Sequence, residues 1–346
     1  MPPSKTHSTR AVASEHDPGT GVARTRAEAL DASTPALARV GGTPVRFGTA
    51  SWTDPTLLAP GVFYPDRVTT AEARLKYYAR LFSMVEVDSS YYALPTPRTA
   101  ELWVERTPDD FVFDVKAFGW MTGHATDAER LPRSLKEALP NELAGKKRLY
   151  AKDVPHAIRE EAWRLFAEAV RPLHEAGKLG AVFLQYPSWV RPAAHSPEML
   201  ARARRRLGDL PIAVEFRHGD WMAESLRERT LALLRANEMS YVVVDEPQGF
   251  ASSVPPVTAV TSPRLAVVRM HGRRAETWEK PGTPVVERFR YLYDERELTP
   301  WVPRIVEIAG ESEQVHVVFN NCYGNYGTTN ALEMSSLVRS DTAATP

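Results

Sequence analysis

Short apolar runs rich in valine and phenylalanine recur along the chain and dominate its pattern of hydrophobic and polar positions. Each run is only five to seven residues long. Such runs are typical of strands that are buried on both faces of a parallel sheet. The pattern predicts eight strands, at residues 45–51, 84–90, 111–117, 180–186, 212–217, 241–245, 265–271 and 315–320.

Segments with the periodicity of amphipathic helices separate most of these strands. The longest begins near Pro155 and places Ile158 and Ala162 on one apolar stripe. An alternation of strands and helices predicts an α/β fold, a single closed (β/α)8 barrel of the TIM type. We expect an irregular stretch between the sixth and seventh strands, where residues 248–264 show no helical pattern. We also expect a long insertion after the third strand, at residues 121–153.

The domain organisation follows from changes in composition. Residues 1–43 are rich in Ser, Thr, Ala, Gly, Pro and Arg and lack a long periodic segment. We therefore expect a disordered N-terminal tail there, with a regulatory or targeting arm as the alternative. Residues 44–340 are predicted to form the barrel domain, and residues 341–346 a flexible C-terminus.

Charge and cysteine content narrow the functional classes. The 43 Lys and Arg residues balance 43 Asp and Glu residues, which argues against a protein dedicated to nucleic acid or a membrane surface. The single cysteine provides no disulfide framework, and no apolar run is long enough to span a membrane. The first residues lack the apolar core of a secretory signal. We expect a cytoplasmic protein without a membrane partner.

Charged and amide side chains occur late in most of the predicted strands. In residues 213–221 (AVEFRHGDW), Glu215 and Arg217 share one side of a strand because side chains alternate with period two. Such charges are costly to bury unless they pair with each other or with a ligand. The late ends of barrel strands meet at one mouth, where active sites are found. The same pattern recurs at Glu86, Asp88, Asp114, Lys116, Gln185, Asp245, Arg269, His271 and Asn320.

These polar residues have two interpretations. Their convergence on one rim favours a functional site, whereas a buried layer of ion pairs without a catalytic role is the alternative. Asp114 is expected to lie too deep to contact a ligand. Aromatic rings around a polar pocket suit a sugar or a nucleobase, although long loops also need hydrophobic cores of their own. Rings in loops after the strands include Trp52, Tyr91, Tyr92, Trp120, Trp189, Trp221, Trp278, Tyr323 and Tyr326.

Other chemistry has weaker support in the sequence. The glycine-rich stretch 320–327 (NNCYGNYG) suits an anion but has neither P-loop nor Rossmann spacing. Cys322 could act as a nucleophile with His271 as its base, but a bystander thiol is favoured. The arginine-rich run 201–207 is expected to be a solvated helix face away from the mouth. A divalent metal would have to use scattered ligands such as Glu86, Asp88, Glu215, Asp245 and His271.

Several motifs in order make the resemblance to a known family specific. They are GTASW at 48–52, GVFYP at 61–65, YYARLFSMVEVDSSYYALP at 77–95, VKA at 115–117, KLGAVFLQYP at 178–187, AVEFRHGDW at 213–221, VRMHGR at 268–273, FNN at 319–321 and NA at 330–331. From about residue 48 to 337 the chain resembles the DUF72 family, also called YecE-like. The resemblance implies a TIM-type barrel and supplies no established reaction.

The family fold has been likened to endonuclease IV and sugar-isomerase barrels, which is an analogy of fold alone. Endonuclease IV-like enzymes rely on several metal-binding histidines, and that complement is not found here. Residues 121–153 and 274–298 depart from the family pattern as long insertions, and the first is expected to form a lid over the mouth.

We therefore predict an enzyme of hydrolase or lyase type acting on a small polar or anionic ligand, such as a sugar phosphate or a nucleotide. Glu215 is the expected general base or metal ligand, with Glu86 or Asp88 as the partner carboxylate and His271 as a proton shuttle. The alternative is a non-catalytic protein that binds nucleic acid or a metabolite. The expected ligand-binding residues are Trp52, Tyr91, Lys116, Gln185, Arg217, His218, Trp221, Asp245, Arg269, Asn320 and Asn321.

Overall fold

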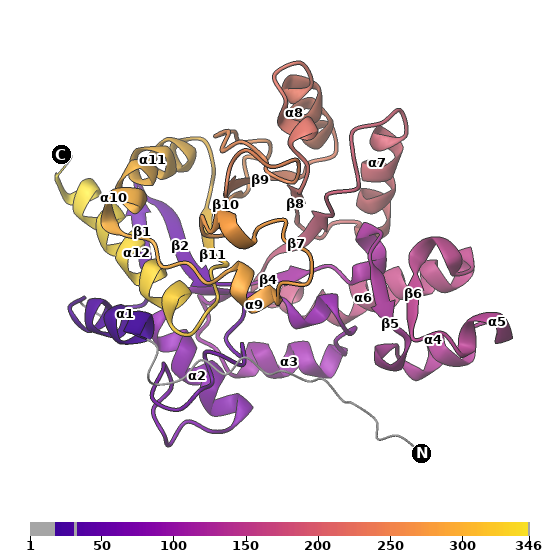
Figure 1. The fold of residues 1–346 in the computed structure, drawn as a ribbon, viewed down its shortest axis with the longest axis horizontal. Helices are drawn as coiled ribbons and strands as arrows, with labels where there is room; N and C mark the ends of the chain where they lie inside the picture. The colour runs from indigo at the N-terminus through magenta and orange to yellow at the C-terminus, as the bar shows by residue number, and fades with distance from the viewer. Residues whose placement is uncertain (1–17, 31–32, 345–346) are drawn as a thin grey trace.

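The fold is built on one curled sheet of nine strands (Figure 1). The computed structural model describes residues 18–30 and 33–344. Eight of the strands run parallel to their neighbours and correspond to the eight apolar runs of the sequence. They are β2 (Thr43–Thr49), β3 (Met84–Val87), β4 (Val112–Lys116), β7 (Leu179–Tyr186), β8 (Ile212–Phe216), β9 (Ser240–Asp245), β10 (Ala266–Met270) and β11 (Val315–Phe319).

The two parallel strands at the ends of the strand order, β2 and β3, lie close together. A parallel bridge joins Ala50 to Glu86, and the Ser51 amide donates to the Glu86 carbonyl at 2.9 Å. A Cβ on Gly48 would lie 2.1 Å from the carbonyl oxygen of Met84, so only glycine permits this approach. The α/β class is as predicted. Between β2 and β3, however, an isolated bridge takes the place of the continuous ladder expected of a closed barrel.

Helices connect most of the parallel strands. Each of these helices packs on the sheet through an apolar stripe. Residues 246–265, between β9 and β10, contain no helix, which confirms the irregular stretch predicted there. The last helix begins at Tyr326. The main helices are α2 (Ala71–Leu81), α3 (Pro97–Glu105), α6 (His156–Glu175), α7 (Ser196–Leu207), α8 (Arg227–Ala236), α11 (Val302–Gly310) and α12 (Tyr326–Ala344).

The expected tail contains ordered elements. α1 (Pro18–Glu28) packs beside α12, and β1 (Leu37–Val40) pairs antiparallel with β2. Gly41 and Gly42 join β1 to β2 with φ of 54° and 93°, the conformation of a two-residue hairpin turn. This Gly-Gly signal was present in the sequence and was missed. Residues 1–17 of the expected tail and residues 345–346 of the expected flexible C-terminus lie outside the described residues. Residues 341–344, the rest of that expected C-terminus, belong to α12.

Two insertions project from the carboxyl ends of the strands. The first pairs β5 (Ala125–Asp127) with β6 (Arg148–Tyr150) and carries α4 (Arg133–Glu137) and α5 (Asn141–Ala144). Figure 1 shows it to one side of the sheet, next to α6. The second contains α9 (Val285–Arg288), drawn in front of the sheet, and α10 (Glu295–Leu298).

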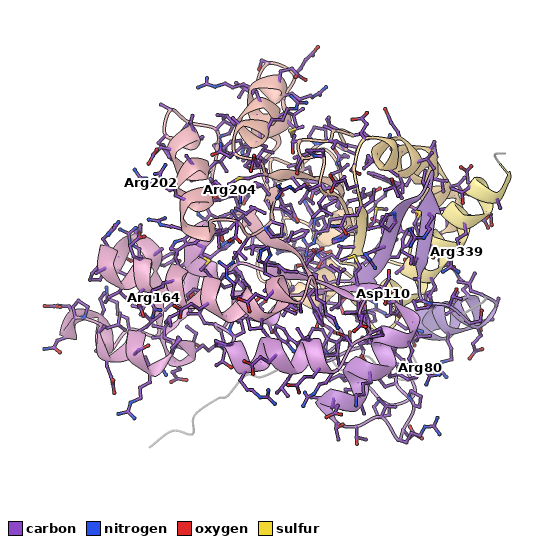
Figure 2. The ribbon with its side chains drawn as sticks, turned by 180° about the vertical axis from the view of Figure 1, so that it is seen from behind. Arg80, Asp110, Arg164, Arg202, Arg204 and Arg339 are labelled. Atoms are coloured by element: carbon purple, nitrogen blue, oxygen red, sulfur yellow. The ribbon has the colours of Figure 1, made fainter. Side chains whose placement is uncertain are left out.

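The arginine-rich run forms the end of α7, on the outside of the molecule (Figure 2). Arg202 and Arg205 pair with Glu198, and Arg206 pairs with Glu160. Arg204 donates to backbone carbonyls at the ends of neighbouring elements. This agrees with the predicted solvated face.

Candidate anion-binding site

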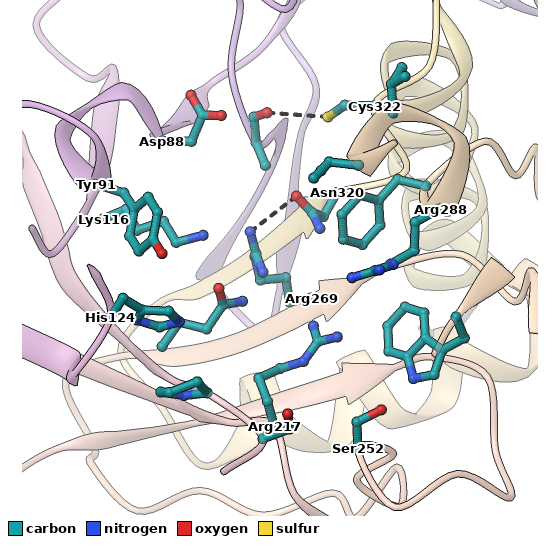
Figure 3. A pocket seen from close by; sticks show the side chains of 18 of the residues that line it. Asp88, Tyr91, Lys116, His124, Arg217, Ser252, Arg269, Arg288, Asn320 and Cys322 are labelled. Carbon is teal, nitrogen blue, oxygen red and sulfur yellow. Dashed lines mark hydrogen bonds between the residues drawn. The ribbon is translucent and has the colours of Figure 1, made fainter. Parts of the chain in front are cut away.

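A cavity of about 880 Å³ opens where the parallel strands end (Figure 3). Neighbouring strands or the residues just after them supply its polar walls. The lining residues that the sequence predicted are Asp88 after β3, Tyr91 after β3, Lys116 of β4, Gln185 of β7, Arg217 after β8, Arg269 of β10 and Asn320 after β11.

Arg269 is the centre of the buried network beneath this cavity. It is 1% exposed and forms a bidentate pair with Glu86 at 2.8 and 2.9 Å. Its Nη1 donates to Glu215 at 2.9 Å, and its Nη2 donates to Asn320 Oδ1 at 3.1 Å. Burial alone would lower the pKa of Arg269, but the two carboxylates raise it. Four of its five N–H groups are used, so one remains for the cavity.

Glu215 is fully enclosed by hydrogen-bond donors. Besides Arg269, it accepts from Gln185 Nε2 at 2.8 Å and from Arg217 Nη1 at 3.3 Å. Burial is the largest single effect and would raise the pKa of Glu215, but the interactions with Arg269, His271 and Arg217 together outweigh it and hold the pKa well below its ordinary range. Glu215 is therefore an ionised anchor for cationic side chains.

His271 links Glu215 to Asn320. Asn320 Nδ2 lies 2.9 Å from His271 Nδ1, and its Oδ1 accepts from Arg269. This orientation assigns the histidine proton to Nε2, which donates to Glu215 Oε1 at 3.1 Å. Burial lowers the pKa of His271 to about 3, so the ring is neutral near pH 7. Glu86, Glu215 and His271 lie behind the cavity wall instead of lining it.

Asp88 and Lys116 also line the cavity, but they do not belong to this network. Neither side chain forms a hydrogen bond within residues 18–30 and 33–344. Burial raises the pKa of Asp88 to about 6, although the nearby Lys116 opposes the shift. Burial and the Arg269 charge lower the pKa of Lys116. The Lys116 ammonium lies 5.0 Å from the centre of the Tyr91 ring. The cavity thus holds one carboxyl group able to change protonation near neutral pH and one lysine side chain without a hydrogen-bond partner in the described structure.

Five of the expected ligand-binding residues do not line the cavity. Asp245 pairs with Met270 in register, whereas Arg269 pairs with Val244, so Asp245 points to the opposite face of the sheet. There it accepts from Arg273 and from Trp301 Nε1. Asn321 is fully buried, and its Nδ2 donates to the Tyr291 carbonyl and to Asn330 Oδ1, both at 2.8 Å.

The other three have structural contacts of their own. His218 accepts from the Asp220 amide at 3.2 Å and caps a short helix. Trp52 packs edge-on against Trp103, and Trp221 stacks on Phe216 with 4.0 Å between ring centres. Asp114 is fully buried, pairs with His316 at 3.0 Å and does not line the cavity, in agreement with its expected depth.

Both insertions contribute cavity residues that the sequence analysis did not identify. The first supplies His124, and the second supplies Arg288 and Phe289. Arg288 Nε is buried without a hydrogen-bond partner within the described ranges, as is the indole N–H of Trp278, which is 3% exposed. Burial and the neighbouring Arg217 charge lower the pKa of Arg288. These donors leave the cavity with unmatched hydrogen-bonding capacity.

The expected metal ligands do not form a metal site. Among the described residues, no group of three or more His, Cys, Asp and Glu side chains is arranged to hold a metal ion. Arg269 occupies Glu86 and Glu215, and Asp245 faces away. The Cys322 thiol donates to the Ala50 carbonyl at 3.2 Å (Figure 3), and burial raises its pKa well above the ordinary value. Cys322 is therefore a thiol rather than a thiolate.

Comparisons with known proteins agree with the motifs of the sequence. The family model described as "Protein of unknown function DUF72" matches residues 46–346. The chain belongs to the DUF72 family. A curated relative of this DUF72 chain, the UPF0759 protein YunF of Bacillus subtilis (strain 168), is 31% identical over 278 residues, 80% of this chain and 89% of YunF.

Solved structures of DUF72 proteins share the fold. The chain matches the protein EF0366 of Enterococcus faecalis V583 with a TM-score of 0.65 and 26% identity, over 85% of this chain and 97% of that one. The match to TM1631 of Thermotoga maritima MSB8 has a TM-score of 0.66 and 29% identity, over 85% and 98%. The predicted DUF72 membership is confirmed. Within the described part of the chain, no helix has both the length and the apolar character needed to cross a bilayer.

Proposed function

We propose that this protein is an enzyme of hydrolase or lyase type that acts on a small anionic ligand, such as a sugar phosphate or a nucleotide. The observation that carries the proposal is the pair formed by Lys116 and Asp88. One offers an ammonium group without a hydrogen-bond partner in the described structure, and the other a carboxyl group with a pKa near 6. In this account the curled sheet works as a TIM-type barrel whose mouth is the cavity.

The anion would be bound by the cationic side chains whose N–H groups have no hydrogen-bond partner in the described structure. Lys116 has three N–H groups available, and Arg217 has a guanidinium whose Nη2 forms no hydrogen bond in the described chain. Arg288 adds a buried donor without a partner. Phosphate and carboxylate groups suit such donors because charge-assisted hydrogen bonds to guanidinium and ammonium groups are short and strong.

Asp88 is the proposed general acid–base, because a carboxyl group with a pKa near 6 exchanges protons efficiently at neutral pH. Glu215 and Glu86 become positioning residues, since their oxygens already accept hydrogen bonds from Arg269. His271 holds Asn320 and Glu215 in place as a neutral ring. The non-catalytic alternative retains the same anion contacts but assigns no proton transfer to Asp88.

A calorimetric titration with inorganic phosphate tests the binding half of this proposal. The wild type is expected to bind phosphate, and Lys116→Met to bind it about 10- to 150-fold more weakly, the value of a hydrogen bond to a charged group. Lys152→Met, which removes an exposed lysine outside the cavity, is the matched control and is expected to match the wild type. Equal phosphate affinity in all three proteins would contradict the assignment.

A further inference from the structure

The cavity has two chemically different halves. Figure 3 shows Tyr91, Lys116 and His124 on one side, Arg288 on the other, Arg269 between them and Arg217 below Arg269. The aromatic half lies after three strands that neighbour one another in the sheet, β3, β4 and β7. The cationic half comes from β8, β10 and the second insertion. Lys116 of β4 lies on the aromatic side, 5.0 Å from the centre of the Tyr91 ring, and its ammonium group points toward the middle of the cavity (Figure 3). A ligand that fills both halves must carry an apolar, ring-like end and an anionic end.

The aromatic half is a chain of three rings, Tyr91, His124 and Trp189, which we call the ring cluster. The centres of Tyr91 and His124 are 5.1 Å apart, and those of His124 and Trp189 are 5.3 Å apart, both in edge-on contact. Burial lowers the pKa of His124 to about 4, so it is a neutral ring near pH 7. The cluster therefore carries no charge that would select an anion.

Trp189 has an exposed ring surface available to a ligand. It lines the cavity yet is 62% exposed, an unusual state for the largest apolar side chain. Its known ring contact, with His124, is edge-on and leaves stacking area open. Trp278, on the cationic side, differs: it is 3% exposed, and the Arg217 guanidinium already lies 4.7 Å from its ring centre.

We propose that the ligand of this cavity is a nucleoside monophosphate, with the base stacked on Trp189 and the phosphate held by Lys116, Arg217 and Arg288. The assignment rests on the proposed function and narrows it, because a planar base offers the ring cluster a larger stacking face than the sugar of a sugar phosphate does. Every nucleobase is planar and has a π face on which an aromatic side chain can stack, so this contact does not depend on which base is present. A volume of about 880 Å³ is far larger than a phosphate needs and lies in the range of small-molecule pockets.

Calorimetric titrations of the full chain with adenosine monophosphate, ribose 5-phosphate and inorganic phosphate test the assignment. We expect adenosine monophosphate to bind about 5- to 150-fold more tightly than ribose 5-phosphate, the range of one base–aromatic stack. Trp189→Ala is expected to remove that advantage and to leave the affinities for ribose 5-phosphate and inorganic phosphate unchanged. Tyr150→Ala, which truncates another exposed ring outside the cavity, should behave as the wild type.

The outcomes separate this inference from the function on which it rests. Equal wild-type affinity for adenosine monophosphate and ribose 5-phosphate would overturn the nucleotide assignment while leaving the anion site intact. A Trp189→Ala variant that loses affinity for all three compounds alike would overturn the stacking role, because truncation would then act on the whole cavity. Failure of every compound to bind the wild type would refute both proposals.

Discussion

Replacing Arg269 with methionine is expected to lower the free energy of unfolding by about 3–5 kcal/mol, the usual cost of removing one partner from a buried ion pair. Methionine retains much of the apolar stem but leaves Glu86 and Glu215 buried without their main cation. Both carboxylates are fully buried, so each loses the cation that compensates the cost of burying its charge. Urea denaturation followed by far-ultraviolet circular dichroism would measure the loss.

The matched control is Arg164→Met, which removes an arginine that also pairs with two glutamates but at the surface. Exposed pairs contribute about 0–1 kcal/mol, so this variant should remain close to the wild type. Adding Glu86→Gln and Glu215→Gln to the Arg269→Met variant should restore part of the stability, because neutral amides do not need a cation. A loss for Arg269→Met no larger than that of Arg164→Met would show that the buried network does not support the fold.

Replacing Asp88 with asparagine is expected to reduce kcat by about 10²- to 10⁴-fold, the contribution of a positioned acid–base group. Asparagine has nearly the same shape and removes a negative charge near Lys116, so affinity for an anionic substrate should stay the same or increase. The measurement is steady-state turnover of the substrate that a screen of nucleotides and phosphate esters identifies. Asp54→Asn is the control, because this second cavity carboxylate already accepts hydrogen bonds from Thr56 and should affect kcat much less.

The pH dependence of the turnover rate is a second test of the acid–base role of Asp88. Because the pKa of Asp88 is raised to about 6, only above that pH is most of the carboxylate ionised and able to accept a proton. A wild-type rate limited by this base should therefore increase as the pH rises through about 6 and then level off, and Asp88→Asn should lack that step. Full turnover in Asp88→Asn would exclude the catalytic role. Tight anion binding without turnover in any tested compound would favour the non-catalytic alternative.

Strand parity explains most of what the sequence predicted correctly. Glu215 pairs in register with Gln185, and Glu86 pairs with Asp114, so each pair shares the inner face as alternation requires. The same rule explains why Asp245 lies away from the cavity. Asp245 was assigned to the site from its late position in a strand, but its register with Met270 places it on the outer face. The register between two strands is set when the sheet assembles, so it cannot be deduced from the sequence of a single strand.

The remaining cavity residues could not be located from local patterns. His124 and Arg288 lie in insertions whose conformation depends on contacts with the rest of the chain, so neither spacing nor periodicity identifies them. The hydrogen-bond partners of Glu215 could not be located from the sequence for a related reason. Its partners Arg269 and His271 lie 54 and 56 residues away, and only their convergence shows that its oxygens are already engaged.

A crystal structure of the wild-type protein with inorganic phosphate would show whether Lys116 and the arginines at the mouth of the sheet bind a small anion beside Asp88. We expect a phosphate within hydrogen-bonding distance of Lys116 Nζ and Arg217, next to the Asp88 carboxyl group. Phosphate bound only elsewhere, with the cavity cations turned away from it, would refute the proposed anion site.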